Sequence, residues 1–256
     1  MSRTLFWQTQ GQGCDLVLIH GWGMNGAAFE QVSQELGKYF TLHIVDLPGY
    51  GFSQAVDVEN FEQLCASVLE NAPEKAVYVG WSLGGLVATQ IALTQPQRVS
   101  HLVSLASSPK FVADESWQGI DPAVLADFST QLKADFQKTV EGFMALQVMG
   151  SPSARQDIRQ IKQAVFSRPM PNPKALSLGL DCLAQVDLRA QLSELQMPFL
   201  RLYGRLDRLV PRQCAKAVLE YAPQSQAHVF KASSHAPFMT ESDLFVQTLR
   251  EFCQNL

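Results

Sequence analysis

The stretch VGWSLGGL, residues 79–86, places a single serine among glycines, directly after the strand-like run AVYV at 76–79. The spacing GWSLG at 80–84 fits a sharp turn from a strand into a helix, where the serine takes a strained backbone conformation and its neighbours must be small. Because GxSxG also occurs by chance in many proteins, the rest of the chain must supply the partners that would make Ser82 a nucleophile.

Short apolar runs recur along the chain and predict buried strands. They cover 16–19, 42–45, 77–79, 102–105 and 199–203, with a weaker run at 228–230. Helix-length segments lie between them, at 26–37, 61–71 and 84–95. Strands without polar alternation are typical of a parallel sheet that helices cover on both faces. The order of these segments therefore predicts an α/β fold with a mostly parallel, doubly wound sheet.

The alternation of strands and helices stops between about 110 and 187, where the pattern predicts a run of helices. We therefore divide the chain into a core of 1–109 and 188–256 and a helical lid insertion of 110–187. Apolar residues recur at helical spacing in this insertion: Phe128, Leu132, Phe136, Val140, Phe143 and Met144. Most of them are expected to form a core of its own, although Phe143, Met144 and Leu146 could equally face the serine.

Composition bounds the class of protein. The chain has 256 residues, 46% of them hydrophobic and 17% charged, which favours one large globular domain or a domain with an insertion. A net charge of −4 gives no case for nucleic acid or an anionic membrane as partner. No run approaches the ~18 apolar residues of a membrane span. We expect a cytoplasmic protein, with a monomer as the default.

The chain has 5 cysteines, which are scattered and lack CxxC spacing. This pattern favours neither a disulfide framework nor a zinc site, and it suits a reducing compartment. No phosphate-binding or dinucleotide-binding glycine motif follows a predicted strand. The sequence therefore implies no metal and no cofactor.

The base that Ser82 needs is predicted to be His235. Hydrolases with a strand–turn–helix serine carry their partners in the order Ser, Asp or Glu, then His. His235, in KASSHAPF, follows the last predicted strand in a loop of small residues. The other histidines fit less well, because they precede the serine, follow its helix at once or fall within a strand pattern: His20, His43, His101 and His228.

The acid that would orient the base is predicted to be Asp207. It lies in LYGRLDRLVP, just after the strand at 199–203. A carboxylate there would accept a hydrogen bond from the imidazole, fix its tautomer and stabilise the imidazolium. Asp181 and Asp187 also have the right order, but they lie at the end of the helical insertion.

Two backbone amides are predicted to stabilise the oxyanion of a tetrahedral intermediate. One belongs to Leu83, which follows the nucleophile at the start of a helix. The other belongs to Trp22, which glycines flank in LIHGWGMN after an early strand. The Trp22 indole could wall the acyl pocket or simply pack on its loop, and the amide argument holds in either case.

Several motifs resemble, in order and across the whole chain, the α/β-hydrolase superfamily. They are HGWG at 20–23, DLPGYGFS at 46–53, GWSLGG at 80–85, GRLDRLVP at 204–211 and the late histidine. The resemblance implies the α/β-hydrolase fold and a Ser-His-Asp mechanism. One departure is Ser234, which stands where many relatives have glycine directly before the histidine.

A narrower resemblance is to the pimeloyl-[acyl-carrier protein] methyl ester esterases of biotin synthesis. It rests on stretches such as WQTQGQG, FTLHIVDLPGYG, GWSLGGLVATQIALTQPQRV and MPFLRLYGRLD, and it runs nearly end to end. The resemblance implies an enzyme that removes a methyl group from the distal carboxyl of a pimeloyl chain on acyl carrier protein. It also implies the residues around the substrate: Trp22, Ser82, Leu83, Phe143, Met144, Ala145, Leu146, Gln147 and His235.

Residues 151–170 are basic in an otherwise acidic chain, with Arg155, Arg159, Lys162 and Arg168 against Asp157. The first three line one face of a predicted helix. Alone, this face is a solvated surface. Given the resemblance, it could equally dock an acidic carrier protein, and Lys138 could extend it. Gly142 stands where the resemblance leads us to expect a further basic residue.

The leading hypothesis is a serine carboxylesterase that acts through an acyl-enzyme. A general short-chain esterase, a thioesterase or a carbon–carbon bond hydrolase would use the same triad, because fold and triad do not name the substrate. A hydrolase-like binding protein without turnover is a further alternative. A dehalogenase is disfavoured, because its nucleophile in this fold is usually aspartate and position 82 is serine.

Overall fold

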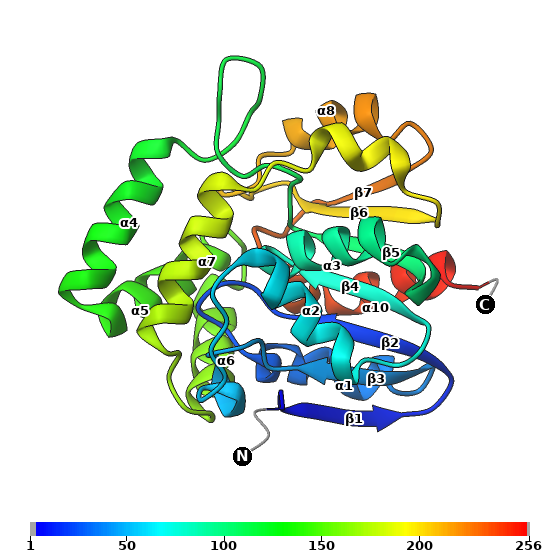
Figure 1. The fold of residues 1–256 in the computed structure, drawn as a ribbon, viewed down its shortest axis with the longest axis horizontal. Helices are drawn as coiled ribbons and strands as arrows, with labels where there is room; N and C mark the ends of the chain where they lie inside the picture. Colours follow the sequence, from blue (N-terminus) through cyan, green and yellow to red (C-terminus); the bar gives the residue numbers. More distant parts are fainter. Residues whose placement is uncertain (1–3, 255–256) are drawn as a thin grey trace.

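A seven-stranded sheet runs through the centre of the computed structural model, which describes residues 4–254 (Figure 1). The strands follow the spatial order β1-β3-β2-β4-β5-β6-β7, and every neighbouring pair is parallel except β1 with β3. The strands are β1 (Trp7–Gly11), β2 (Cys14–Ile19), β3 (Phe40–Val45), β4 (Ala76–Trp81), β5 (Val99–Leu105), β6 (Phe199–Gly204) and β7 (Gln226–Phe230).

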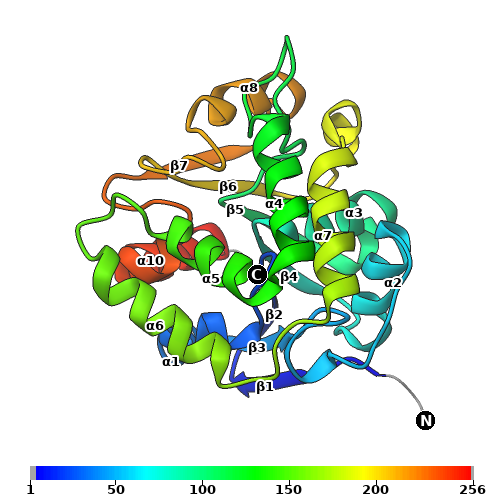
Figure 2. The same ribbon diagram turned by 90° about the vertical axis from the view of Figure 1, so that its left-hand side faces the viewer.

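Helices cover both faces of the sheet. Helices α2 and α3 lie on one face, and α1 and α10 lie on the other (Figures 1 and 2). The helices of the core are α1 (Glu30–Leu36), α2 (Phe61–Asn71), α3 (Leu83–Thr94), α8 (Gln213–Tyr221), α9 (Pro237–Thr240) and α10 (Ser242–Phe252). Every residue of β4 is buried, as expected for a central strand between two helical layers.

Four helices come between β5 and β6: α4 (Pro122–Ala134), α5 (Phe136–Gln147), α6 (Ala154–Phe166) and α7 (Pro173–Gln185). They gather beyond one end of the sheet, on the left of Figure 1 and facing the viewer in Figure 2. The chain leaves and re-enters the core at one place, because Lys110 and Asp187 form an isolated β-bridge. Arg189 and Asp114 join them in an ion-pair network.

The predicted α/β sheet is confirmed, with two local differences. The sequence does not predict β1. This edge strand lies beside β3, and its three central residues, Gln8, Thr9 and Gln10, are polar rather than apolar. The helix predicted over 26–37 begins as a 3₁₀ turn at Gly26–Phe29, which the side chain of Asn25 caps, and only then continues as α1. Strand β7 is at the other edge of the sheet and is largely exposed, which explains its weak apolar pattern.

The turn that holds Ser82 joins β4 to α3 with little free space. Ser82 has φ 55° and ψ −118°, a conformation that L-residues rarely adopt. A Cβ on Gly80 would lie 2.1 Å from the carbonyl oxygen of Gly84, and one on Gly84 would lie 2.3 Å from that of Ile19. The glycines of GWSLG therefore let the start of α3 pack directly against its own strand and against β2.

A buried ion pair joins the insertion to the core. Arg168 follows α6, and its guanidinium donates to Asp46 Oδ1 at 2.7 Å and to Gln8 Oε1 at 2.9 Å. Asp46 also accepts from the backbone amides of Gly26 and Phe52, at 2.7 and 2.8 Å. The two charged side chains are 7% and 0% exposed. Arg168, which the sequence groups with the basic residues of 151–170, therefore adds no charge to the surface there.

Replacing Arg168 by methionine is expected to lower the free energy of unfolding by about 3–5 kcal/mol, because Asp46 would stay buried without its cation. Urea denaturation measures this loss. The exposed Arg212 is the control, because its change to methionine should shift the free energy by less than about 0.5 kcal/mol. Equal losses in the two variants would contradict a special role for the buried pair.

Candidate active site

The three side chains of the predicted triad meet in the structure. Ser82 Oγ lies 2.9 Å from His235 Nε2, and His235 Nδ1 lies 2.7 Å from Asp207 Oδ2. All three residues are buried, with 2%, 0% and 6% of their surface exposed. The carboxylate can only accept, so Nδ1 carries the ring proton and Nε2 is free to accept from the serine. This arrangement allows the imidazole to take a proton from the hydroxyl.

Asp207 is held by the loop that follows β6. Its Oδ1 accepts from the backbone amides of Leu209 and Val210, at 2.8 and 2.9 Å, which leaves Oδ2 for the imidazole of His235. Both alternative acids lie elsewhere. Asp181 is exposed on α7, and Asp187 pairs with Arg189 at 2.7 Å, which holds the pKa of Asp187 below its usual range.

His235 lies in the loop between β7 and α9. Ser234, the departure from the family pattern, is buried there without backbone strain. Among the non-glycine residues from 4 to 254, only Ser82 and Ala106 have positive φ. The conformation at Ser234 therefore does not require glycine.

The two predicted oxyanion donors flank the serine. Ile19 pairs with Gly80 across β2 and β4, so the loop after β2 runs beside the turn at Ser82. Both Trp22 and Leu83 are fully buried. Over residues 4–254, neither backbone amide donates a hydrogen bond to another protein group. Two free, buried N–H groups beside the predicted nucleophile are the kind of donor that a developing oxyanion needs.

His20, which chain order excludes as the base, supports the loop of Trp22. Its Nδ1 donates to the carbonyl of Gly21 at 2.8 Å, and its Nε2 accepts from the amide of Leu47 at 3.0 Å. Burial lowers the pKa of His20 to about 4, so the ring is neutral at pH 7. The sequence contained a signal for this contact, because HGWG and DLPGYG follow neighbouring parallel strands.

The side chain of Trp22 joins the core to the insertion. Its Nε1 donates to the carbonyl of Leu176 on α7 at 2.8 Å, and its ring meets Phe143 on α5 edge to face at 4.8 Å. The segment 143–147, which the resemblance placed around the substrate, lies on α5 and has its residues on two faces of that helix. Phe143, Met144 and Gln147 are buried, whereas Ala145 and Leu146 are partly exposed. The insertion therefore brings one face of α5 against Trp22.

The basic residues predicted to dock a carrier lie on α5 and α6, which pack side by side (Figure 2). Arg155 and Arg159 are exposed one turn apart on α6, and Lys138 is exposed on α5. Lys162 instead pairs with Glu141 at 3.0 Å. The exposed positive charge is therefore carried mainly by Arg155, Arg159 and Lys138.

Asp157, the acid counted within the basic stretch, is buried rather than exposed. Its carboxylate accepts from the hydroxyls of Ser153 at 2.8 Å and Thr240 at 2.9 Å. It therefore joins α6 to α9 and does not neutralise the surface of α6. Nothing lies within 4 Å of a Cβ built on Gly142, so this position has room for a larger side chain.

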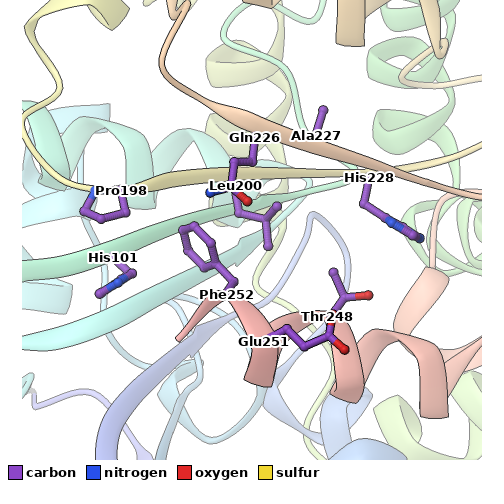
Figure 3. A pocket seen from close by; sticks show the side chains of 9 residues that line it. All are labelled: His101, Pro198, Leu200, Gln226, Ala227, His228, Thr248, Glu251 and Phe252. Atoms are coloured by element: carbon purple, nitrogen blue, oxygen red, sulfur yellow. The ribbon is translucent and has the colours of Figure 1, made fainter. Parts of the chain in front are cut away.

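A surface pocket of about 610 Å³ lies far from the triad, at the amino ends of β5, β6 and β7 (Figure 3). Its lining includes His101 and His228, two of the histidines excluded as the base, and Thr248, Glu251 and Phe252 of α10. His101 packs edge to face on Phe252, with ring centroids 5.2 Å apart. The carboxyl ends of the same strands point to the triad, so this pocket and the triad lie at opposite ends of the sheet.

Over residues 4–254, no helix is long and apolar enough to cross a membrane. No group of three or more His, Cys, Asp or Glu residues in that range is arranged to hold a metal ion. The five cysteines are free thiols, and four of them are buried.

The fold and the triad define the class of protein. The profile of the family described as alpha/beta hydrolase fold matches residues 16–242, and the chain belongs to this family. A narrower likeness follows. A pimeloyl-[acyl-carrier protein] methyl ester esterase from Vibrio parahaemolyticus is 59% identical over 255 residues, 100% of each chain. A protein of the same name from Vibrio cholerae is 58% identical over 252 residues, 98% of this chain and 99% of its own. The predicted resemblance is confirmed.

Solved structures of lower identity share the fold. An esterase from Exiguobacterium antarcticum superposes with a TM-score of 0.84 at 21% identity, covering 98% of this chain and 95% of its own. An enol-lactonase from Burkholderia xenovorans superposes with a TM-score of 0.84 at 17% identity, covering 98% of this chain and 96% of its own. These two likenesses describe the architecture alone.

Proposed function

We propose that this protein is a serine carboxylesterase that hydrolyses the methyl ester of pimeloyl-acyl carrier protein to the free acid and methanol. The observation that carries the chemistry is the continuous contact from Ser82 Oγ through His235 to Asp207, at 2.9 and 2.7 Å. The substrate is supported by the likeness to two pimeloyl-[acyl-carrier protein] methyl ester esterases, which are 58% and 59% identical over nearly the whole chain.

The triad performs the reaction in two halves. Ser82 Oγ attacks the ester carbonyl while His235 Nε2 takes its proton, and the C–O bond to the methoxy group breaks as His235 returns that proton to give methanol. Water then attacks the acyl-enzyme, loses its proton to His235 and releases Ser82 with the new carboxylic acid. Asp207 accepts from Nδ1–H throughout and stabilises the imidazolium.

The free amides of Trp22 and Leu83 are proposed to bind the oxyanion in both halves. The buried face of α5, with Phe143, Met144 and Gln147, is proposed to line the acyl chain together with the Trp22 ring. Ala145 and Leu146 belong to the segment that the resemblance implies, but their partial exposure supports a smaller share of the contact.

We also propose that residues 110–187 act as a lid over this site. Two contacts support this role, because the insertion touches residues of the site directly. The amide of His235 donates to the carbonyl of Gln147 at 2.8 Å, and the indole of Trp22 donates to the carbonyl of Leu176. The cytoplasmic location and the monomeric state stay predictions from the sequence.

Product analysis tests the proposed reaction, because the substrate carries two cleavable bonds. The methyl oxyester lies at the distal end of the pimeloyl chain, and a thioester joins the other end to the carrier. We expect the mass of the acylated carrier to fall by one methylene, with release of methanol. Release of the carrier with a free thiol would instead identify a thioesterase, and an unchanged substrate would contradict the proposed function.

The carrier is proposed to dock on the exposed charges of Arg155, Arg159 and Lys138. Lys138 lies on α5, which contacts the site through Phe143 and Gln147. The two arginines lie on α6, which packs against α5. Acyl carrier proteins are acidic, so complementary charge beside the site would speed their encounter. The pairing of Lys162 with Glu141 supports a smaller share for that residue.

Reversing both arginines, Arg155→Glu with Arg159→Glu, is expected to lower kcat/KM for the carrier-bound ester about 10–100-fold, because electrostatic attraction would become repulsion. Hydrolysis of a free short-chain methyl ester should change less than about twofold, since the triad is untouched. Steady-state kinetics on the two substrates measures both effects.

The control makes the same change in net charge elsewhere, with Lys75→Glu and Lys216→Glu. Both lysines are exposed, one just before β4 at its amino end and the other on α8. Neither substrate should respond strongly to this pair. An equal loss on both substrates in the arginine variant would contradict docking on α6.

A further inference from the structure

The main chain of His235 is held from two sides, beyond the contacts of its ring. Its carbonyl accepts from the indole Nε1 of Trp81 at 2.7 Å. Its amide donates to the carbonyl of Gln147, the last residue of α5, at 2.8 Å. His235 lies in a loop, where no helix or strand ladder fixes its backbone. These two hydrogen bonds therefore hold the stretch of main chain that carries the imidazole of His235.

Trp81 is unusually placed to do this. It is the last residue of β4 and directly precedes Ser82, so the nucleophile and the donor that holds the base are neighbours in the chain. Its ring is fully buried and packs edge to face on Phe238 of α9, with centroids 4.9 Å apart. A strand at the centre of the sheet is among the most rigid parts of an α/β domain.

From this geometry we propose that Trp81 is a positioning residue, whose indole N–H fixes the carbonyl of His235 and thereby the distance between the imidazole and Ser82 Oγ. The inference rests on the proposed catalytic role of the triad. Trp81 and Ser82 are consecutive residues at the end of β4. The same turn therefore positions both the nucleophile and the main chain of the base.

The contact also explains why a large aromatic residue stands within a glycine-rich turn. The indole N–H is at the far edge of a two-ring side chain, so it can reach across the core to a loop from another strand. A phenyl ring would fill most of the same space without a donor. The carbonyl of His235 would then be buried with one acceptor site unpaired, and the loop would shift to find a partner.

If the indole N–H of Trp81 had a purely structural role, its loss would lower Tm and leave kcat unchanged. Buried tryptophan N–H groups usually find a partner, so the hydrogen bond alone does not demonstrate positioning. Trp117 provides a matched comparison. It is also buried, and its Nε1 donates to the backbone carbonyl of Lys110 at 2.8 Å, at the start of the insertion and not at the triad.

The experiment compares Trp81→Phe with Trp117→Phe on a short-chain p-nitrophenyl ester, together with the rate of inactivation by a fluorophosphonate. We expect Trp81→Phe to lower kcat about 10–100-fold, with KM within about twofold and inactivation slowed in parallel, as expected for a misplaced base. Trp117→Phe should lower Tm and leave kcat within about twofold of the parent. Equal kcat values for Trp81→Phe and the parent would overturn the proposal.

A second variant guards against a packing defect. Benzothienylalanine at position 81 keeps the two-ring shape and lacks the N–H, so it should reproduce the loss of kcat with Tm close to the parent. Full activity in this variant would assign the effect of Trp81→Phe to volume and overturn the proposal. Failure of the proposed triad chemistry is distinguishable, because the parent protein would then show neither ester hydrolysis nor fluorophosphonate labelling. Failure of the proposed substrate alone would leave both activities in the parent, and the comparison of variants would still hold.

Discussion

Replacing Ser82 by alanine is expected to lower kcat for ester hydrolysis about 10⁶-fold, the size of loss that removal of the nucleophile causes in other serine hydrolases. The Ser82 hydroxyl is the proposed attacking group, and its side-chain partner in the structure is His235 Nε2. Loss of this one contact should leave the fold intact. Rates on a short-chain ester and a fluorophosphonate labelling assay measure the loss. Labelling of the Ser82→Ala variant at the rate of the parent would contradict the assignment of the nucleophile.

Ser82→Gly is the matched variant, because it removes the same hydroxyl and also relieves the backbone. The positive φ of 55° at this position costs a residue with a side chain about 1–3 kcal/mol. Both variants should be inactive, and the glycine variant should be at least as stable as the alanine variant in urea denaturation. A glycine variant much less stable than the alanine variant would contradict a strained turn.

Replacing Asp207 by asparagine is expected to lower kcat about 10⁴-fold at neutral pH. An amide N–H₂ group facing Nδ1 would favour the tautomer with its proton on Nε2, and that nitrogen could then no longer accept from Ser82. The loss should appear in kcat, with little change in KM. Steady-state kinetics on a free ester is sufficient to measure it.

The same substitution should leave the loop after β6 in place. The amide oxygen of an asparagine can still accept from Leu209 and Val210, as Oδ1 of Asp207 does at 2.8 and 2.9 Å. Tm should therefore stay close to that of the parent. More than about a tenth of the parent activity in this variant would show that Asp207 does not orient the base.

The positions of the proposed nucleophile, acid and base could be predicted from the sequence, because each follows a predicted strand, clearly apolar before residues 82 and 207 and only weakly apolar before residue 235. Parallel strands bring their carboxyl ends to one edge of a sheet, so residues 82, 207 and 235 were expected to converge. The structure supplies the contacts that join them. The glycines of GWSLG were a reliable signal for the same reason, since only a close packing of α3 on β2 and β4 requires them.

Contacts between distant, polar or partly apolar segments could not be predicted in this way. The sequence grouped Arg168 with the surface charges of α6, yet the structure pairs it with Asp46 in the core. Residues 46 and 168 lie far apart in the chain, and no local pattern distinguishes a buried arginine from an exposed one. For the same reason the sequence did not show that the indole of Trp81 reaches the loop of His235.

The most direct test of the proposed function is kcat/KM for methyl pimeloyl-acyl carrier protein beside a matched free methyl ester, each at low and high salt. We expect a strong preference for the carrier-bound ester that weakens as salt screens the charges of α5 and α6. Equal values for the two esters, unchanged by salt, would contradict a carrier-directed esterase and leave a general short-chain esterase on the same triad.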